Sequence, residues 1–181
     1  PLVGPVVAAA VILPKNYTLE GLIDSKQLSE KKRDKFYDII VKDAISYAVG
    51  VVDAKTIDEI NIYEASRKAM LEAIDGLSVK PEYVLTDAMP LSMENSKAII
   101  HGDALSLNIA AASVIAKVTR DKMMYELDEK YPMYGFKDHK GYPTKKHLEA
   151  IKKYGILDNY RLTYKPVKAL MEVNDEEFVK E

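Results

Sequence analysis

A short apolar run that ends in an acidic residue constrains the fold of this chain most. Residues 83–88 read Tyr-Val-Leu-Thr-Asp-Ala, with Pro81 before the run and Pro90 after it. Tyr, Val and Thr favour β-structure, and a short apolar run between turn residues is typical of a buried strand. The sequence therefore predicts a strand that delivers the carboxylate of Asp87 to the edge of a sheet.

A second acidic residue, Asp103, follows directly before a long Ala-rich segment. Residues 104–130 are nearly all helix formers and stop at Tyr131-Pro132, so we expect one long helix there. Two carboxylates at one sheet edge repel each other unless a cation or a proton lies between them. Carboxylate oxygens suit Mg²⁺ or Mn²⁺, and the pair therefore predicts a divalent metal site.

Each of these acidic residues also has a purely structural explanation. Asp87 could be a solvated residue that begins the turn Asp-Ala-Met-Pro. Asp103 could do no more than cap the helix that starts at Ala104. For either residue alone the structural explanation is the commoner one, and only the two together favour a metal site.

The remaining elements alternate between strands and helices. We expect strands at residues 6–13, 44–53, 83–87 and 97–100, and helices at residues 30–43, 62–75, 104–130 and 145–154. Ser29 and Thr144 are N-cap candidates, as are Thr56 and Asn61 for the helix that Gly76 ends. Residues 134–144 are expected to form a loop. Strands that alternate with helices predict an α/β domain.

Composition narrows the class of protein. A chain of 181 residues with 48% apolar content fits one domain, expected at residues 1–170, with an acidic tail at 171–181. Because there is no cysteine, disulfides, thiolate catalysis and the usual structural zinc sites are excluded. Without a signal peptide or an apolar span of membrane length, we expect a cytoplasmic protein with no membrane association. The chain starts at Pro1 without a methionine, so we expect a cut N-terminus.

A basic and aromatic stretch follows the long helix. Gly141 lets the backbone turn and Pro143 restricts Tyr142 to an extended conformation, so the Tyr142 ring and hydroxyl are expected at a loop tip. Such a ring can stack on a sugar or bond to a 2′-OH, although loop tyrosines more often pack under their own loop. The lysines around it are Lys137, Lys140, Lys145, Lys146, Lys152 and Lys153.

These lysines could form a footprint for a phosphate backbone, and a solvated lysine face is an equally good explanation. The net charge of −2 does not exclude a local basic face. Arg161 follows the stretch, and Lys26 in the loop Asp24-Ser25-Lys26 could also meet a phosphate. His101 and His147 lack any zinc spacing, and we assign them no role.

Taken in order, these motifs resemble ribonuclease HII, the type 2 RNase H family. The resemblance runs from Pro1 to about Val167. Its most specific parts are Asp24-Ser25-Lys26, Leu85-Thr86-Asp87, Gly102-Asp103, Ile109 to Ser113, Ala116 to Asp121, Tyr131-Pro132, Tyr134-Gly135-Phe136 and His139 to Tyr142. It implies an RNase H-like fold, a mixed sheet flanked by helices with a helical C-terminal portion.

The resemblance also implies a function and a site. It implies endonucleolytic cleavage of the RNA strand of RNA–DNA hybrids, and incision at ribonucleotides embedded in duplex DNA, by a monomer that serves in ribonucleotide excision repair. In the family that this chain resembles, four carboxylates hold two divalent ions, Mg²⁺ or Mn²⁺. Asp87 and Asp103 match two of them as catalytic and metal-binding residues. Tyr142 matches the tyrosine that senses the ribonucleotide 2′-OH, and Lys26, Lys140 and Arg161 are the other expected substrate contacts.

Two departures from the family pattern matter. The motif Asp-Glu-Val-Gly-Arg-Gly, which ends the family's first strand and supplies the other two carboxylates, should stand directly before Pro1 and is not in this sequence. The family's His-Arg-x-Ser-Phe is here Tyr160-Arg161-Leu162-Thr163-Tyr164, a mild change that keeps Arg161. We therefore expect this chain alone to be inactive. The alternatives are a nucleic-acid-binding module without catalysis, another Mg²⁺-dependent phosphoryl-transfer enzyme, and a type 3 RNase H.

Overall fold

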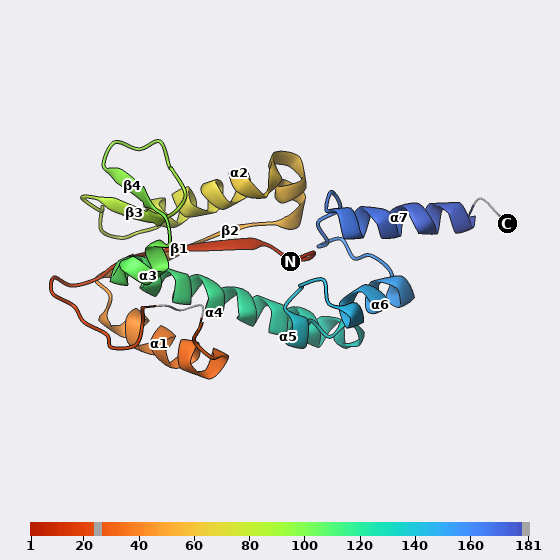
Figure 1. Ribbon diagram of the computed structural model, residues 1–181, viewed down its shortest axis with the longest axis horizontal. Coiled ribbons are helices and arrows are strands. Elements are labelled where there is room, and N and C mark those ends of the chain that lie inside the picture. The colour runs from red at the N-terminus through yellow and green to blue at the C-terminus, as the bar shows by residue number, and fades with distance from the viewer. Residues whose placement is uncertain (24–26, 179–181) are drawn as a thin grey trace. The chain divides into compact units, whose positions relative to one another are not determined.

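Four strands and a series of helices make up residues 1–23 and 27–178, the part of the chain that the computed structural model describes (Figure 1). The strands are β1 (Val6–Ile12), β2 (Ser46–Val52), β3 (Val84–Asp87) and β4 (Ser96–Ile99). The helices are α1 (Glu30–Asp43), α2 (Ala54–Asp75), α3 (Gly102–Leu105), α4 (Leu107–Lys130), the 3₁₀ turn η2 (Pro132–Tyr134), α5 (Phe136–His139), α6 (Lys145–Tyr154) and α7 (Lys165–Phe178).

The chain folds into two compact units. The strand unit contains residues 7–51 and 66–119, and the helical unit contains residues 1–6, 52–65 and 120–181. Both α2 and α4 contribute one end to each unit. The expected division into a domain at 1–170 and a tail at 171–181 stays a prediction, and α7 extends as a helix to Phe178.

In the strand unit, the described strands form two separate pairs, β1 with β2 and β3 with β4. The N–H of Ile45 donates to the carbonyl of Ile12 at 2.8 Å, so the end of β1 meets the start of β2 and this pair is antiparallel. The β3–β4 pair is parallel, with Val84 opposite Ser96 and Asp87 opposite Ile99. The mixed strand directions and the flanking helices confirm the expected α/β class.

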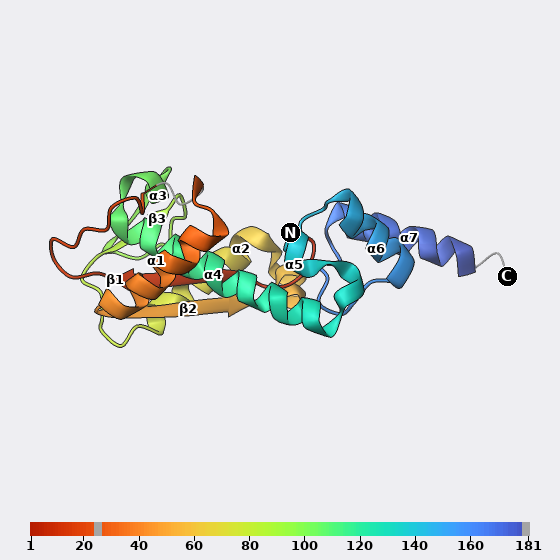
Figure 2. The same cartoon turned by 90° about the horizontal axis from the view of Figure 1, so that it is seen from below.

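Helices cover both faces of the β1–β2 pair (Figures 1 and 2). One face packs on α1 and α4 through a buried cluster that includes Ile40, Val114 and Ile115. On the other face α2 lies so close that a Cβ built on Gly50 would stand 1.9 Å from the carbonyl oxygen of Ala69. The apolar first half of α4 is therefore core, as its composition predicts.

The helical unit has its own core, in which aromatic rings from several elements meet. Tyr134, Phe136, Tyr160 and Val167 are among its buried residues. Phe136 and Tyr134 stack with their planes 3° apart and their centroids 5.3 Å apart. The N-terminal residues are bound into this unit through an antiparallel bridge between Val3 and Tyr160.

Most helix caps confirm their sequence signals. Ser29 Oγ accepts from the N–H of Lys32, and Thr144 Oγ1 accepts from the N–H of His147. Gly155, with φ of 93°, ends α6. Asn61 has a non-helical φ of 71° inside α2, and its side chain accepts from the N–H of Glu64.

Three sequence expectations were wrong. The single helix expected at 104–130 is broken at Ser106, an extended residue whose hydroxyl accepts from the N–H of Ile109, so Asp103 lies inside the short helix α3. The expected loop 134–144 contains α5. Asp53, rather than Thr56, caps the first part of α2, because its carboxylate accepts from the N–H of Thr56 at 2.8 Å.

Within residues 1–23 and 27–178, no helix is long and apolar enough to span a bilayer.

Candidate active site

Asp87 is the last residue of β3, as predicted, and the end of the strand fixes its carboxylate. Its Oδ1 accepts a hydrogen bond from the N–H of Gly102 at 3.0 Å. The next residue, Ala88, has a φ of 58° and donates its N–H to the carbonyl of Ile99 at 2.9 Å. The backbone therefore turns sharply after Asp87 while the parallel pairing with β4 continues. The carboxylate is half-buried at this turn.

Asp103 lies next to the residue that Asp87 binds. It is only 3% exposed and sits in the first turn of α3, a helix that packs against β3. Gly102 fits between these elements without a side chain, because a Cβ there would stand only 2.6 Å from Cδ1 of Ile109, whereas Cα of Asp87 would be at an ordinary contact distance of 3.4 Å. The hydrogen bond from Gly102 to Asp87 thus brings the two predicted acidic residues to one end of β3.

An apolar groove of about 730 Å³ runs beside Asp87. Its long walls are residues 7–13 of β1 and the following turn, and residues 79–87, which include β3. Side chains of α4, among them Ile109, Ala112 and Ser113, also line it, together with Met70 and Ile74 of α2. In the described residues β1 pairs only with β2 and β3 only with β4, so each of these strands has one edge without a partner strand.

Two carboxylates alone make an incomplete site for a divalent pair. Among the described residues no group of three or more His, Cys, Asp or Glu side chains is arranged to hold a metal ion. The donor set is nevertheless of the right chemistry, because Asp87 and Asp103 offer hard carboxylate oxygens. The residues present therefore fit part of a divalent metal site.

Tyr142 lies in the helical unit, on the loop between α5 and α6. Its side chain is 55% exposed, so it does not pack beneath its own loop. Lys140 and Gly141 have φ values of 53° and 91°, and the N–H of Tyr142 donates to the carbonyl of His139 at 2.9 Å. A Cβ on Gly141 would stand 2.8 Å from Cγ1 of Val3, so the glycine is needed for space as well as for its φ.

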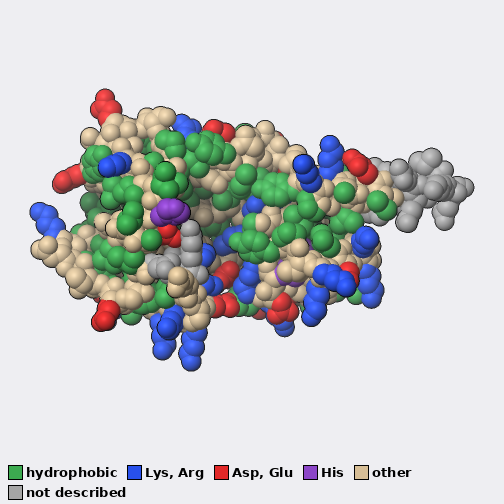
Figure 3. All heavy atoms as spheres, in the orientation of Figure 1, with side chains coloured by type: hydrophobic (Ala, Val, Ile, Leu, Met, Phe, Trp, Pro, Cys, Tyr) green, Lys and Arg blue, Asp and Glu red, His purple; other side chains and the backbone are tan. Residues whose placement is uncertain are grey.

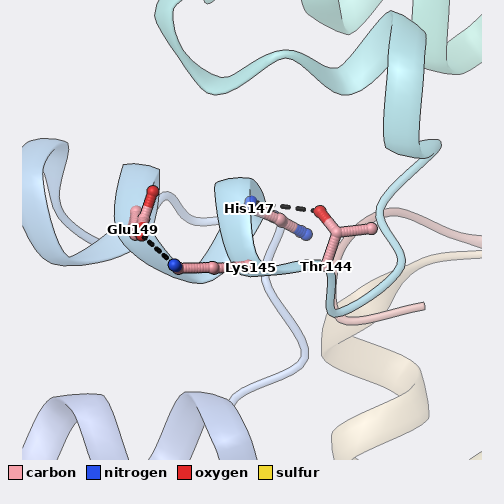
Figure 4. Close-up of polar contacts among 4 residues, drawn as sticks. All are labelled: Thr144, Lys145, His147 and Glu149. Atoms are coloured by element: carbon pink, nitrogen blue, oxygen red, sulfur yellow. Dashed lines mark hydrogen bonds and ion pairs between the residues drawn. The ribbon is translucent and has the colours of Figure 1, made fainter.

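Basic side chains surround this loop. Figure 3 shows Lys and Arg side chains gathered around α5 and α6. The ammonium group of Lys140 lies 4.2 Å from the ring centroid of Tyr125 and donates to that residue's hydroxyl at 3.1 Å. Lys145 and Glu149 lie 4.0 Å apart on the exposed face of α6 (Figure 4), too far apart and too solvated to neutralise each other strongly.

Two further substrate contacts were predicted, at Lys26 and Arg161. Lys26 lies outside the described residues. Arg161 is only 3% exposed, and its guanidinium donates to the carbonyls of Pro1, Gly4 and Pro5 at 3.1–3.3 Å. These bonds hold the N-terminal segment in the helical unit. A substrate contact by Arg161 stays a prediction.

Sequence reasoning missed His139, His147 and Arg120. His147 is fully buried, and its ring nitrogens lie 2.8 Å from the carbonyl of Tyr142 and 2.7 Å from the hydroxyl of Tyr160. Arg120 donates to the carbonyl of Lys140 at 2.8 Å. Zinc spacing was the wrong test for His147. Its position three residues after the cap residue Thr144, on the buried face of α6, was the available signal.

Comparisons with known proteins agree with one another. The family model described as Ribonuclease HII matches residues 1–167. A Ribonuclease HII of Bacillus cereus is 56% identical over 173 residues, which cover 95% of this chain and 67% of the relative. The crystal structure of ribonuclease H2 from Pyrococcus horikoshii OT3 has a TM-score of 0.80 and 29% identity, over 97% of this chain and 94% of that one.

A more distant likeness shows the fold alone. The structure of Bst-RNase HIII in complex with Mn²⁺ has a TM-score of 0.71 and 17% identity, and covers 97% of this chain and 67% of that one.

Proposed function

We propose a function from the premise that the chain belongs to the ribonuclease HII family and is by family a ribonuclease H endonuclease. In this proposal it cleaves the RNA strand of RNA–DNA hybrids and incises duplex DNA at embedded ribonucleotides. The observation that carries this proposal is the hydrogen bond between Gly102 and Asp87, which joins both predicted acidic residues at one strand end. A family match at 56% identity supports it.

Asp87 and Asp103 would hold divalent ions, Mg²⁺ or Mn²⁺, through their carboxylate oxygens. When bound, a pair of such ions supplies an activated water and stabilises the leaving 3′-oxygen. The hydrogen bond from Gly102 orients Asp87, and the burial of Asp103 in α3 fixes its side chain. The strand and helix ends thus keep both carboxylates in place before any substrate arrives.

The remaining two carboxylates would come from a further strand in the groove beside Asp87. The groove is bordered by residues 7–13 and 79–87, and among the described residues the strand within each range has one edge without a partner strand. A strand between them would be buried by α4 and α2, so it would have to be apolar on both faces. The resemblance implies such a strand, ending in Asp-Glu-Val-Gly-Arg-Gly, and the 181 residues do not contain that motif.

Substrate recognition would belong to the helical unit. The exposed Tyr142 ring would contact the ribose that carries the 2′-OH, and the Lys140 ammonium and the α6 lysines would contact phosphates. Location in the cytoplasm, action as a monomer and a part in ribonucleotide excision repair stay predictions.

Turnover of a ribonucleotide-containing duplex in Mg²⁺ tests the proposal. The chain preceded by a strand that ends in Asp-Glu-Val-Gly-Arg-Gly should cleave, and the 181-residue chain alone should not. Asp87→Asn in the extended chain should lower turnover by roughly a hundredfold or more while hybrid binding persists. Clear metal-dependent turnover by the 181-residue chain would contradict the hypothesis that its metal site is incomplete.

The second candidate is a nucleic-acid-binding module without catalysis, which the basic surface around α5 and α6 favours. Under that alternative the extended chain would bind hybrid and show no turnover for Asp87→Asn to remove.

A further inference from the structure

Two histidines lie behind the loop that carries Tyr142, and their rings stack. The centroids of His139 and His147 are 3.9 Å apart and the ring planes are 12° from parallel. The Phe136 ring lies edge-to-face with both histidine rings, and its centroid is 5.7 Å from that of His139 and 5.8 Å from that of His147. Because His147 is fully buried and His139 partly so, the pair is a fixed part of the helical core.

Every ring nitrogen of the pair has a partner, and two of the partners belong to the loop itself. The N–H of Gly141 donates to Nδ1 of His139 at 3.0 Å, and Nε2 of His139 lies 2.8 Å from the carbonyl of Tyr134. Nδ1 of His147 lies 2.8 Å from the carbonyl of Tyr142. The Nδ1 atoms thus bind the main chain on both sides of the peptide that joins Gly141 to Tyr142.

The partners fix the tautomer of each ring. An N–H can only donate, so Nδ1 of His139 must be unprotonated, and its Nε2 then carries the hydrogen that the Tyr134 carbonyl accepts. A carbonyl can only accept, so Nδ1 of His147 must carry a hydrogen. Its Nε2 is then free to accept from the Tyr160 hydroxyl at 2.7 Å. Burial lowers the pKa of both rings, to about 4 for His147, which keeps them neutral in this arrangement.

We infer that His139 and His147 are positioning residues that fix the main chain of Gly141 and Tyr142 through their two Nδ1 atoms, and so set the direction of the Tyr142 ring. The inference rests on the proposed function of Tyr142 as the residue that meets the ribonucleotide. Tyr142 is 55% exposed, so packing covers less than half of it, and its main chain sets the direction in which the ring leaves the loop.

Ring tautomers can be measured without any substrate. Long-range ¹H–¹⁵N spectra of the full chain at neutral pH should show His139 protonated at Nε2 and His147 protonated at Nδ1. The reverse tautomer on either ring would overturn the inference, because the bond to the loop would then be impossible.

Asn and Gln variants separate the two nitrogens of each ring. The amide of Asn reaches the place of Nδ1, and the longer Gln reaches the place of Nε2. His147→Asn can still donate to the Tyr142 carbonyl, whereas His147→Gln can reach only Tyr160. His139→Asn and His139→Gln form the matched pair on the other ring, with an amide oxygen accepting from Gly141 in the Asn variant.

Two quantities are measured for each variant. The first is the ratio of its affinity for a duplex with one ribonucleotide to its affinity for the same all-DNA duplex, without divalent metal, and the second is the melting temperature of the protein. Both Gln variants should lower the ratio by about five- to tenfold, the effect of one lost hydrogen bond, and the Asn variants should keep most of it. If Asn and Gln variants lower the ratio equally, in step with their melting temperatures, the histidines are merely structural and the inference is overturned.

Tyr142→Phe separates this inference from the proposed function. If Tyr142→Phe leaves the ratio at the wild-type value, the proposed role of Tyr142 fails, and with it the positioning role. If Tyr142→Phe lowers the ratio and neither Gln variant does, only the positioning role fails.

Discussion

The N–H of Gly102 and the carboxylate of Asp87 are joined by a hydrogen bond of 3.0 Å that crosses from the start of α3 to the end of β3. The position of Gly102 is tight, because a Cβ there would stand 2.6 Å from Cδ1 of Ile109. The hydrogen bond links the turn after β4 to the strand that carries the first acidic residue, and Asp103 follows Gly102 directly. The geometry of the candidate metal site therefore depends on a glycine that has no chemistry of its own.

Gly102→Ala should disturb this geometry by a known contact. The added Cβ would lie 2.6 Å from Cδ1 of Ile109, a side-chain tip that can move only at a cost in the buried wall of α4. We expect the free energy of unfolding to fall by about 1–3 kcal/mol, measured by urea titration. Ile109→Val removes Cδ1 and is the matched background, in which Gly102→Ala should cost distinctly less. An equal cost in both backgrounds would contradict the contact.

Gly50→Ala should be far more damaging, because the contact is with backbone. A Cβ at Gly50 would lie 1.9 Å from the carbonyl oxygen of Ala69 and 3.0 Å from the N of Ala73, so α2 would have to leave β2. We expect a loss of roughly 4 kcal/mol or more, or no folded protein, by thermal unfolding. Val51→Thr is the control on the same strand, since Val51 is 41% exposed, and it should change stability by less than about 1 kcal/mol.

Local chemistry explains which elements were predictable. The caps at Ser29 and Thr144 rest on a hydroxyl that accepts from an N–H three residues on, so they can be found in a short window of sequence. The break at Ser106 has helix formers on both sides, and only a single serine signals it. Helix propensity therefore favours one continuous helix, whereas in the structure the chain bends at Ser106 and Asp103 lies beside β3.

The candidate site was predictable where it follows the end of a strand and hidden where it depends on tertiary packing. Asp87 and Asp103 stand beside strand and helix signals in the sequence. The stack of His139 on His147 depends on how α5 packs against α6, and hydrophobic periodicity in the sequence does not predict that packing. Arg161 shows a second limit, because its burial against main-chain carbonyls cannot be read from a basic residue beside a basic stretch.

Arg161→Lys therefore tests whether Arg161 stabilises the fold or contacts the substrate. The guanidinium reaches the carbonyls of Gly4 and Pro5 and the hydroxyl of Tyr164 together, and a single ammonium cannot match that geometry in a buried place. We expect the free energy of unfolding to fall by about 2–3 kcal/mol. The salt dependence of hybrid binding should stay unchanged. Lys146 lies on the exposed face of α6, and Lys146→Ala should leave the free energy of unfolding unchanged. It should instead reduce the slope of log affinity for the hybrid against log salt concentration by about the value of one phosphate contact.

His147 should make the stability of the chain depend on pH. Burial lowers its pKa from 6.5 to about 4 in the folded protein, so between these values the unfolded chain binds a proton that the folded chain does not. Stability from this residue is therefore fully present above pH 6.5 and is lost as the pH falls toward 4, by roughly 3 kcal/mol in all. His139 acts in the same direction, because burial lowers its pKa too. Urea unfolding at pH 7.5 and pH 4.5 measures the difference. In His147→Asn, which cannot take up the proton, the difference should shrink to what the carboxylates and His139 contribute, and an unchanged difference would contradict the assignment.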